Sequence, residues 1–335
     1  MKILLTGYTG NLGFALANAW PQHRIVALVR NPESAPRLDH VEICAGALEH
    51  LPDSHTGEVE AIVHCAASTA FRAPLDELRQ TNVEGTARLL AWAKNCPRLE
   101  RFLQVSTVCV AGEQTGLIAE AAIPSAPPFT NAYEQSKWEA EQAVLGSALP
   151  VEIVRVSTVT GSEDDGSVRR LGAIHQLVYW LMRGLVPMMP GEASAPVDFI
   201  STGSAVRVLS QVIHTPVSPG RIVHAAAGTS APALGEVLDH LRAIFSRHLP
   251  AWARGVIALP DFADAPTWSR FAASAEQSGD LLFRRIVADA QSFLPALLHP
   301  RRYATSLPSE GDWRTLLTRN VEWLLRHQWR PAHAN

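Results

Sequence analysis

The stretch ILLTGYTGNLGFAL, residues 3–16, sets three glycines three residues apart between an apolar run and an amphipathic segment. Gly7 allows a tight turn, Gly10 lets a pyrophosphate approach the backbone, and Gly13 lets the following helix pack closely on the strand. The free N–H groups at the start of that helix then face the phosphates. The stretch predicts a strand, a dinucleotide-binding loop and a helix, with a ligand-free turn as the alternative. The loop residues expected to contact the dinucleotide are Gly7, Thr9, Gly10, Asn11, Leu12 and Gly13.

Short apolar runs alternate with longer amphipathic segments through the first half of the chain. These runs are not interleaved with polar residues, so they indicate parallel strands covered by helices on both faces. The fold class expected is α/β, a doubly wound parallel sheet of the Rossmann type. Strands are expected at 2–6, 24–30, 41–45, 60–66, 101–106 and 151–157, and helices at 11–20, 74–95 and 131–147.

The rhythm of the chain changes near residue 160. A dinucleotide-binding domain is therefore expected over 1–160, with 196–230 returning to its sheet. Residues 161–195 and 231–330 are expected to form a smaller, mainly helical substrate-binding subdomain, because the later part is rich in Trp, Leu and Arg and broken by prolines. The two strands expected to return to the sheet are 196–201 and 221–227.

The composition is that of a soluble globular protein: 335 residues, 47% hydrophobic, 18% charged, with a formal net charge of −3. This balance gives no support for a nucleic-acid partner. The sequence shows neither the roughly eighteen apolar residues that a membrane span needs nor an opening signal peptide. Its cysteines lack metal-ligand spacing, so no metal site and a reducing, cytoplasmic location are expected. The four cysteines are Cys44, Cys65, Cys96 and Cys109.

An arginine follows the second expected strand, in VALVRNPE at 26–33. Folds that prefer NAD usually place an acid there to bind the ribose 2′-hydroxyl, whereas an arginine can pair with a 2′-phosphate. Arg30 therefore favours NADPH over NADH, and Arg37 is a weaker second candidate. An exposed arginine that closes a strand without a ligand is the alternative.

The stretch AYEQSKWEAE, residues 132–141, places Tyr133 and Lys137 one helical turn apart on the same face. A lysine beside a tyrosine favours the phenolate and lowers the phenol pKa from its usual value of about 10. Such a phenol can donate a proton at neutral pH. Asn131 and Glu134 are placed as a capping box at the start of this helix. A surface helix with scattered charges is the alternative.

Five motifs in order give the first 230 or so residues a specific resemblance to the extended short-chain dehydrogenase/reductase superfamily. The chain is most similar to its branch of fatty acyl-CoA reductases and thioester reductase domains. That narrower likeness rests on Phe71 after HCAAS, the tryptophan in YEQSKWEAE, PVDFIS (196–201) and FLPALLHPRRYATS (293–306). The five motifs are TGYTGNLG (6–13), HCAAS (64–68), TNVEGT (81–86), QVSTVCVAG (104–112) and YEQSK (133–137).

The resemblance implies a role for each matching residue. Tyr133 matches the general acid that protonates a carbonyl oxygen as hydride arrives. Lys137 matches the residue that binds the nicotinamide ribose and lowers the tyrosine pKa. Thr107 falls where a hydroxyl hydrogen-bonds the substrate carbonyl. The HCAAS motif implies further cofactor contacts at Ala66 and Ala67.

Two further positions bear on the support of the site and on the loop beside the nicotinamide. Asn82 matches a family asparagine whose role in extended members is often structural. The family commonly has Arg-Pro after its sixth strand, whereas this chain has Arg155 and Val156. The loop beside the nicotinamide is therefore expected to differ from the family pattern.

A few other side chains are candidates for chemistry or binding. Cys65 or Cys109 could form an acyl-enzyme, but free cysteines are usually small core residues, and nothing nearby in the sequence suggests thiolate activation. His64 and His175 are expected to be packed residues rather than bases. The apolar stretch 177–190 fits an acyl channel and a core helix equally well.

Three functions remain open at this level. The first is an NADPH-dependent reductase that converts an acyl thioester, delivered on CoA or on a separate carrier protein, into an aldehyde or alcohol. The second is a reductase of ketones or aldehydes, or an alcohol dehydrogenase, which needs the same residues. The third is an NADP(H)-binding sensor without turnover. The resemblance also implies a possible homodimer through the helices at 74–95 and 131–147.

Overall fold

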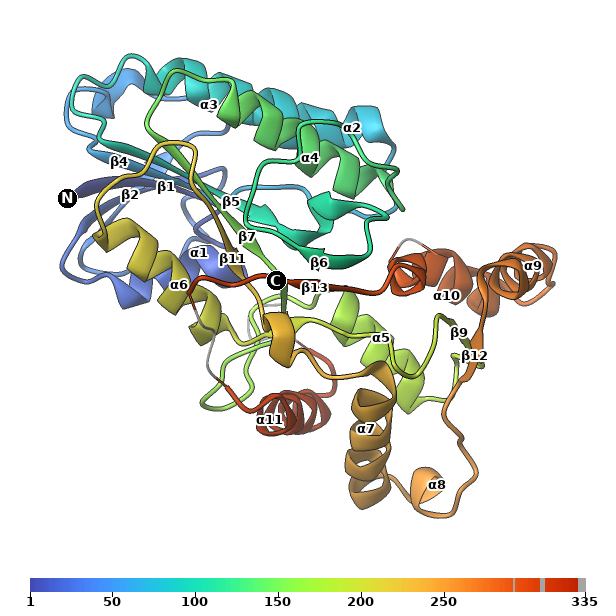
Figure 1. Ribbon diagram of the computed structural model, residues 1–335. Helices are drawn as coiled ribbons and strands as arrows, with labels where there is room; N and C mark the ends of the chain where they lie inside the picture. The colour runs from blue at the N-terminus through green and yellow to red at the C-terminus, as the bar shows by residue number, and fades with distance from the viewer. Residues whose placement is uncertain (292, 308–310, 331–335) are drawn as a thin grey trace.

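The computed structural model describes residues 1–291, 293–307 and 311–330. A seven-stranded parallel sheet runs in the order β11-β7-β5-β4-β1-β2-β3 (Figure 1). This confirms the doubly wound α/β class expected from the alternating pattern. The order reverses between β1 and β4, and ligands of such folds bind beyond the strand ends at that switch point. The strands are β1 (Lys2–Thr6), β2 (Arg24–Val29), β3 (Val41–Ala45), β4 (Ala61–His64), β5 (Arg101–Thr107), β7 (Val151–Val156) and β11 (Ile222–Ala225).

Helices cover both faces of the sheet (Figure 1). α1 (Asn11–Ala19) and α6 (Thr202–His214) pack together on one face, and α2, α3 and α4 lie on the other. Ile3 and Leu5 join the core under α1 and α6, whereas Leu4 between them joins the core under α3 and α4. Both faces are therefore apolar, which explains the strands without polar alternation. The helices of the second face are α2 (Leu75–Arg79), α3 (Gly85–Ala93) and α4 (Ala132–Leu145).

Two expected elements differ from the structure. A π-helical turn, Gln80–Glu84, interrupts the helix expected over 74–95. The expectation that 196–201 returns to the main sheet is wrong, because its β10 (Phe199–Ile200) pairs with β8 (Thr158–Val159) in a separate sheet. β8 follows β7 after a break at Ser157, so β10 meets the chain where it has already left the main sheet. The other expected strand, β11, does pair with β7.

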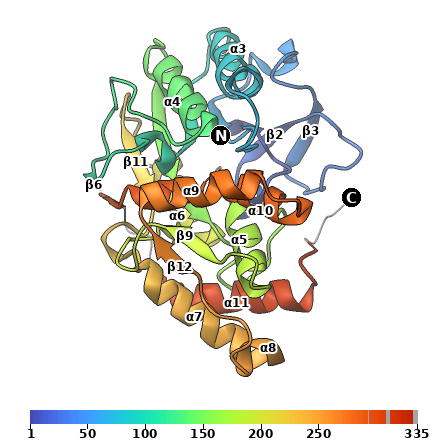
Figure 2. The same ribbon diagram turned by 90° about the vertical axis from the view of Figure 1, so that its right-hand side faces the viewer.

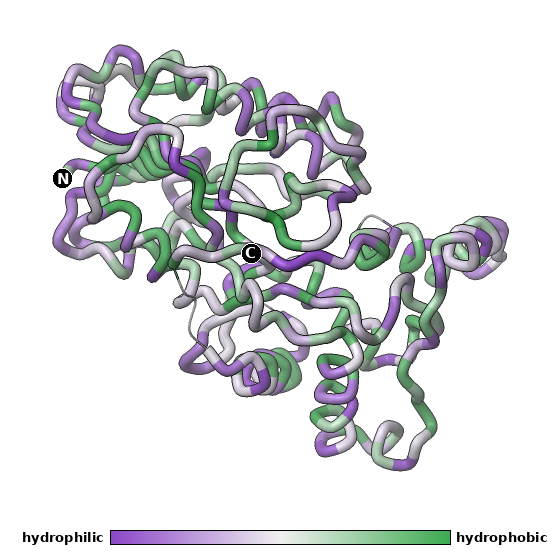
Figure 3. Tube along the Cα trace, viewed as in Figure 1, coloured by the Kyte–Doolittle hydropathy of each residue, from purple (hydrophilic) through white to green (hydrophobic). Residues whose placement is uncertain are grey.

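The later part of the chain forms a mainly helical lobe below the sheet (Figure 2). Its core is separate from those of the sheet and includes Met189, Phe245 and Val321. In Figure 3 the helices of this lobe alternate between hydrophobic and hydrophilic colours, as burial of one helix face requires. The helices of the lobe are α5 (Ala173–Met182), α7 (Leu234–His248), α8 (Pro250–Ala253), α9 (Ala265–Glu276), α10 (Leu281–Gln291) and α11 (Trp313–Arg326).

Two short parallel strand pairs join segments that are far apart in the sequence. β9 (Met188–Pro190) pairs with β12 (Asp261–Ala263) within the lobe. β13 (Arg301–Tyr303) pairs with β6 (Gly116–Ile118), which brings the late chain back beside the segment that follows β5. Short 3-10 helices complete the secondary structure at Asp53–His55, Val108–Ala111, Gly228–Ser230 and Leu294–Leu298.

Candidate active site

The glycine loop between β1 and α1 fits the approach of a dinucleotide. Gly7 has a φ of +72°, a conformation that favours glycine. A Cβ on Gly13 would lie 2.3 Å from the Gly7 carbonyl oxygen, so a larger residue would push the helix away from the loop. α1 begins after Gly10 without a side chain that caps its first N–H groups. Those groups are left to bind a phosphate.

The segment after β4 forms the other side of this switch point. The Ala66 N–H donates to the Thr6 hydroxyl at 3.1 Å, and a Cβ on Gly7 would come within 2.7 Å of the Ala66 nitrogen. Residues expected to bind the cofactor therefore meet here from two neighbouring strands. The remaining members of that expected set are half-buried at the same place: Thr9, Asn11, Leu12 and Ala67.

Two arginines lie beyond the end of β2. Arg30 follows the strand directly and is exposed, and no hydrogen bond or ion pair engages its guanidinium within the described ranges. Arg37 is also exposed, and its Nη2 donates to the Pro32 carbonyl at 3.2 Å. Both guanidinium groups are in a region where a 2′-phosphate could pair with them.

The three expected catalytic side chains gather at the carboxyl end of β5. Thr107 is the last residue of that strand, and its hydroxyl accepts from the Cys109 N–H at 3.2 Å. Tyr133 and Lys137 are buried on α4, and the Lys137 Nζ donates to the Val105 carbonyl at 3.2 Å. Accepting this bond uses a lone pair of the Thr107 oxygen, so its single O–H can interact either with the Tyr133 hydroxyl beside it or with a substrate carbonyl.

Burial shifts the pKa values of Tyr133 and Lys137, and the spacing of the two residues along the helix did not predict this effect. Burial raises the pKa of Tyr133 above its usual value, and an interaction with the Thr107 hydroxyl offsets this only in part. The expected lowering of the phenol pKa is therefore wrong for the protein alone, since loss of hydration disfavours the phenolate. Burial also lowers the pKa of Lys137 to about 8, against the raising effect of Glu141.

Asn82 and the start of α4 are structural supports of the site. The Asn82 side chain accepts from the Ser68 N–H at 2.8 Å and donates to the Ser136 hydroxyl at 2.9 Å, so it ties the segment after β4 to α4. The Asn131 side chain caps α4 by accepting from the Glu134 N–H at 2.9 Å. In return Glu134 accepts from Thr130, one residue before the residue that a capping box would use.

Arg155 and Val156 lie where the family that the chain resembles commonly has Arg-Pro. The side chains of Arg155 and Glu141 are each 1% exposed, and Arg155 Nη2 lies 2.8 Å from a Glu141 carboxylate oxygen. The pair joins β7 to α4 one turn beyond Lys137. Val156 continues the strand between Thr107 and Ala225, where a proline could not donate to the ladder.

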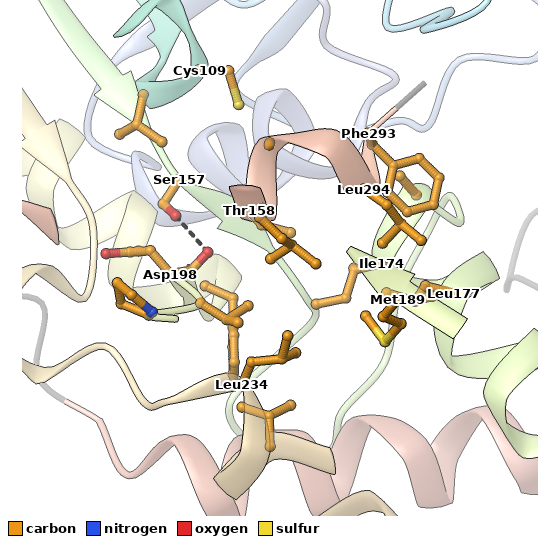
Figure 4. A pocket seen from close by; sticks show the side chains of 18 of the residues that line it. Cys109, Ser157, Thr158, Ile174, Leu177, Met189, Asp198, Leu234, Phe293 and Leu294 are labelled. Carbon is orange, nitrogen blue, oxygen red and sulfur yellow. Dashed lines mark hydrogen bonds between the residues drawn. The ribbon is translucent and has the colours of Figure 1, made fainter. Parts of the chain in front are cut away.

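A cavity of about 230 Å³ lies between the sheet and the second lobe (Figure 4). Cys109, Ser157 and Asp198 are at one end of it, and the Ser157 hydroxyl donates to the Asp198 carbonyl at 2.9 Å. Most of the remaining wall is aliphatic or aromatic. Labelled apolar side chains that line it in Figure 4 are Ile174, Leu177, Met189, Leu234, Phe293 and Leu294.

Phe71 connects this cavity to Tyr133. It lines the cavity, and its ring centroid lies 4.7 Å from that of Tyr133. Phe293 extends the aromatic wall at 6.5 Å from Phe71. Leu177, from the stretch 177–190, also lines the cavity, which favours the channel interpretation of that stretch. Sequence reasoning missed Asp198 as a wall residue, because its stretch PVDFIS (196–201) was interpreted only as a strand of the main sheet.

The other candidates for chemistry are held in structural roles. Burial raises the pKa of the Cys65 thiol to about 12 and also raises that of Cys109, so neither is an activated thiolate. His64 lies between the hydroxyls of Thr6 and Thr86, and burial lowers its pKa to about 3. His175 is likewise buried, with its Nε2 2.5 Å from the Thr160 carbonyl.

Two kinds of feature are absent from the described residues. No group of three or more His, Cys, Asp or Glu side chains there could hold a metal ion. No helix in residues 1–291, 293–307 and 311–330 is both long and apolar enough to cross a membrane.

Comparison with known proteins gives matches in sequence and in fold. The family described as "Male sterility protein" matches residues 46–209, which include Thr107, Tyr133 and Lys137. A hybrid PKS-NRPS synthetase of Penicillium oxalicum is 28% identical over 230 residues, which are 62% of this chain and 6% of that protein.

A ketoreductase of Stigmatella aurantiaca acts on a 4-hydroxy-2-methyl-3-oxo-4-farnesyl-3,4-dihydroquinoline-1-oxide and is 31% identical over 182 residues. That match covers 51% of this chain and 54% of the relative, so the chain spans about half or less of these curated relatives. In fold, the terminal R domain of the myxalamid PKS-NRPS pathway superposes with a TM-score of 0.79 at 21% identity, over 99% of this chain and 92% of that domain. The resemblance expected from the five motifs is therefore confirmed: the chain is similar, in sequence and in fold, to the extended short-chain dehydrogenase/reductases of the male sterility branch.

Proposed function

We propose that the protein is an NADPH-dependent reductase of acyl thioesters with an apolar acyl group. The observation that carries this proposal is the apolar cavity whose wall residue Phe71 packs against Tyr133. An aliphatic chain can fill such a cavity with a favourable free energy, whereas a sugar or nucleotide would lose its hydration there without replacement hydrogen bonds. The polar end at Cys109 and Ser157 is the end for the reacting carbonyl.

Thr107, Tyr133 and Lys137 each have a separate role in the reduction. Bound NADPH supplies the hydride. Thr107 donates a hydrogen bond to the carbonyl oxygen, and Tyr133 delivers the proton to that oxygen as negative charge develops on it. Lys137 binds the nicotinamide ribose and lends its positive charge to the phenol. One hydride and one proton convert the thioester into a hemithioacetal. Its C–S bond then breaks and the hydroxyl proton passes to the sulfur, which gives an aldehyde and a free thiol.

The preference for NADPH rests on Arg30. Its exposed guanidinium, which no protein group engages in the described part of the chain, is available to a 2′-phosphate. The glycine loop and the uncapped start of α1 support binding of either dinucleotide. We expect the thioester to arrive on CoA or on a carrier protein, as the likeness to a synthetase R domain suggests. The homodimer through α2, α3 and α4 stays a prediction.

A ketone reductase is the second candidate. The Stigmatella aurantiaca ketoreductase favours it, because this chain covers a far larger share of that relative than of the synthetase. Its farnesyl-bearing substrate would also suit apolar walls. A sensor without turnover is disfavoured, since dinucleotide binding alone does not require a buried tyrosine and lysine beside a substrate cavity.

The release of thiol separates the two enzyme functions. We expect NADPH oxidation with a medium-chain acyl-CoA to release one free thiol for each aldehyde formed. The measurement follows absorbance at 340 nm together with a thiol-reactive dye, and the matching aldehyde and methyl ketone serve as controls. Turnover of the ketone without any thioester turnover would contradict the thioester proposal and leave the ketone reductase.

The pKa of Lys137 gives the reaction a defined alkaline limit. We expect kcat/KM for reduction to fall as the pH rises through about 8, because Lys137 then loses the charge that the ribose and the phenol require. Lys137→Arg keeps its charge at these pH values, so its residual activity should show no such limb. An unchanged limb in Lys137→Arg would show that another group titrates.

A further inference from the structure

An arginine of the second lobe lies at the phosphate-binding end of α1. Arg169 belongs to the loop between β8 and α5, and its guanidinium carbon is 3.9 Å from the ring centroid of Phe14 on α1. Its Nε is buried without a hydrogen-bond partner in the described residues, and no carboxylate pairs with the side chain there. A buried guanidinium N–H without a partner costs folding free energy, and a ligand that accepts a hydrogen bond from it would remove that cost.

The backbone of the loop is fixed where it meets the glycine loop. Asn11 Nδ2 donates to the Arg170 carbonyl at 2.9 Å, and the Arg170 N–H donates to Asn11 Oδ1 at 2.7 Å. Gly166 has a φ of +76°, and a Cβ there would meet the Arg319 carbonyl oxygen at 2.2 Å, so this turn packs directly on α11. Arg169 is therefore held in place between the first turn of α1 and the second lobe.

The electrostatics of this position call for an anion. The start of α1 carries the positive end of the helix dipole, so a cation beside it is unfavourable unless an anion lies between them. Arg37 belongs to the same neighbourhood, because it follows Pro36, whose carbonyl accepts from the Tyr8 hydroxyl at 2.9 Å. Tyr8 is itself packed near Phe14, with ring centroids 5.9 Å apart.

We propose that Arg169 binds a phosphate group of the dinucleotide, so that the second lobe contributes directly to the cofactor site. The inference rests on the proposed cofactor and adds a residue that the glycine motif and the arginines after β2 do not include. It also explains why Asn11 is engaged with the Arg170 backbone: the helix start and the arginine are positioned as one unit. The phosphate bound is either the pyrophosphate, shared by NADH and NADPH, or the 2′-phosphate of NADPH alone.

Binding of NADPH and of NADH to the full chain tests the proposal without reference to turnover. Dissociation constants come from the quenching of tryptophan fluorescence for the wild type, Arg169→Gln, Arg169→Lys and Arg170→Gln. We expect Arg169→Gln to weaken binding about 10- to 100-fold, as for loss of a charge-assisted hydrogen bond, and Arg169→Lys to weaken it less. Loss for both dinucleotides indicates the pyrophosphate, and loss for NADPH alone indicates the 2′-phosphate.

Arg170→Gln is the matched control, because it removes an equal charge from the neighbouring, exposed side chain. Unchanged affinities in Arg169→Gln would overturn the proposal, as would an equal loss in Arg170→Gln, which would show a general effect of charge. Thermal melting of each variant checks that the loop is still folded. If the wild type binds neither dinucleotide, the proposed function itself fails, and this result is distinct from failure of the Arg169 contact.

Discussion

Tyr133→Phe should lower turnover at least ~10²-fold while leaving the affinity for NADPH unchanged. The substitution removes only the phenolic O–H. The ring remains to pack against Phe71, whose centroid lies 4.7 Å away, so the fold and the cavity wall should be retained. The carbonyl oxygen then loses its proton donor at the moment when negative charge develops on it. Steady-state kinetics and a separate measurement of NADPH binding check the two halves of this result.

Two other tyrosines make the test specific. Tyr179 lies on α5, where it packs against Trp329 with ring centroids 5.3 Å apart, and Tyr179→Phe should have nearly wild-type turnover. Tyr303 lines the cavity, and its hydroxyl accepts from Arg301 Nε at 2.9 Å. If Tyr303→Phe lost turnover while Tyr133→Phe kept it, the general acid would have to be reassigned to Tyr303.

Because burial raises the pKa of Tyr133, the phenol needs nearby positive charge from Lys137 and the cofactor to release its proton. Burial holds the proton on the phenol, so the protein alone stores the acid in its protonated form. A donor must also release its proton when charge appears on the substrate. The positive charge of Lys137 would favour that release, and a bound nicotinamide cofactor would supply a second positive charge. Turnover of the wild type should therefore depend on the charge of Lys137, which is why we expect kcat/KM to fall as the pH rises through about 8.

Local spacing predicted much of the fold and the places of the candidate side chains Tyr133 and Lys137. The glycine loop, the strands and the Tyr133–Lys137 helix each follow from residues that are neighbours in the sequence, so a short pattern contains the information. The direction of the Tyr133 pKa did not follow, because spacing along a helix does not reveal burial. The sheet that 196–201 joins could not be predicted either, because its apolar pattern suits a strand in the seven-stranded sheet and in the separate β8–β10 pair equally well.

Apart from the stretch 177–190, the cavity wall could not be predicted, because it is assembled from distant segments. Phe71, Cys109 and Asp198 come from three separate loops or short elements, and Phe293 arrives from late in the chain. Their proximity depends on how the second lobe packs on the sheet and on the pairing of β13 with β6. Arg169 is a similar case, since its sequence neighbourhood gives no sign that it reaches α1.

Arg155→Met should lower the free energy of unfolding by about 3–5 kcal/mol, the usual cost of leaving one member of a buried ion pair alone. Both side chains are only 1% exposed, and Arg155 contacts Glu141 through Nε at 3.0 Å and Nη2 at 2.8 Å. Its Nη1 also donates to the Ala121 carbonyl at 3.0 Å. The substitution would remove the donors that the Glu141 carboxylate and that carbonyl have among the described residues. Urea unfolding followed by circular dichroism measures the change.

An exposed pair gives the matched control for this prediction. Arg207 and Glu163 are 49% and 37% exposed, so Arg207→Met should cost less than about 1 kcal/mol. The double variant Arg155→Met/Glu141→Leu should recover most of the stability lost in Arg155→Met, because it removes the stranded charge together with its partner. A loss in Arg155→Met no larger than that in Arg207→Met would mean that water reaches Glu141. In that case the pair could not hold α4 on β7, and the position of Lys137 would have to depend on its bond to Val105 and on the Asn82 bridge instead.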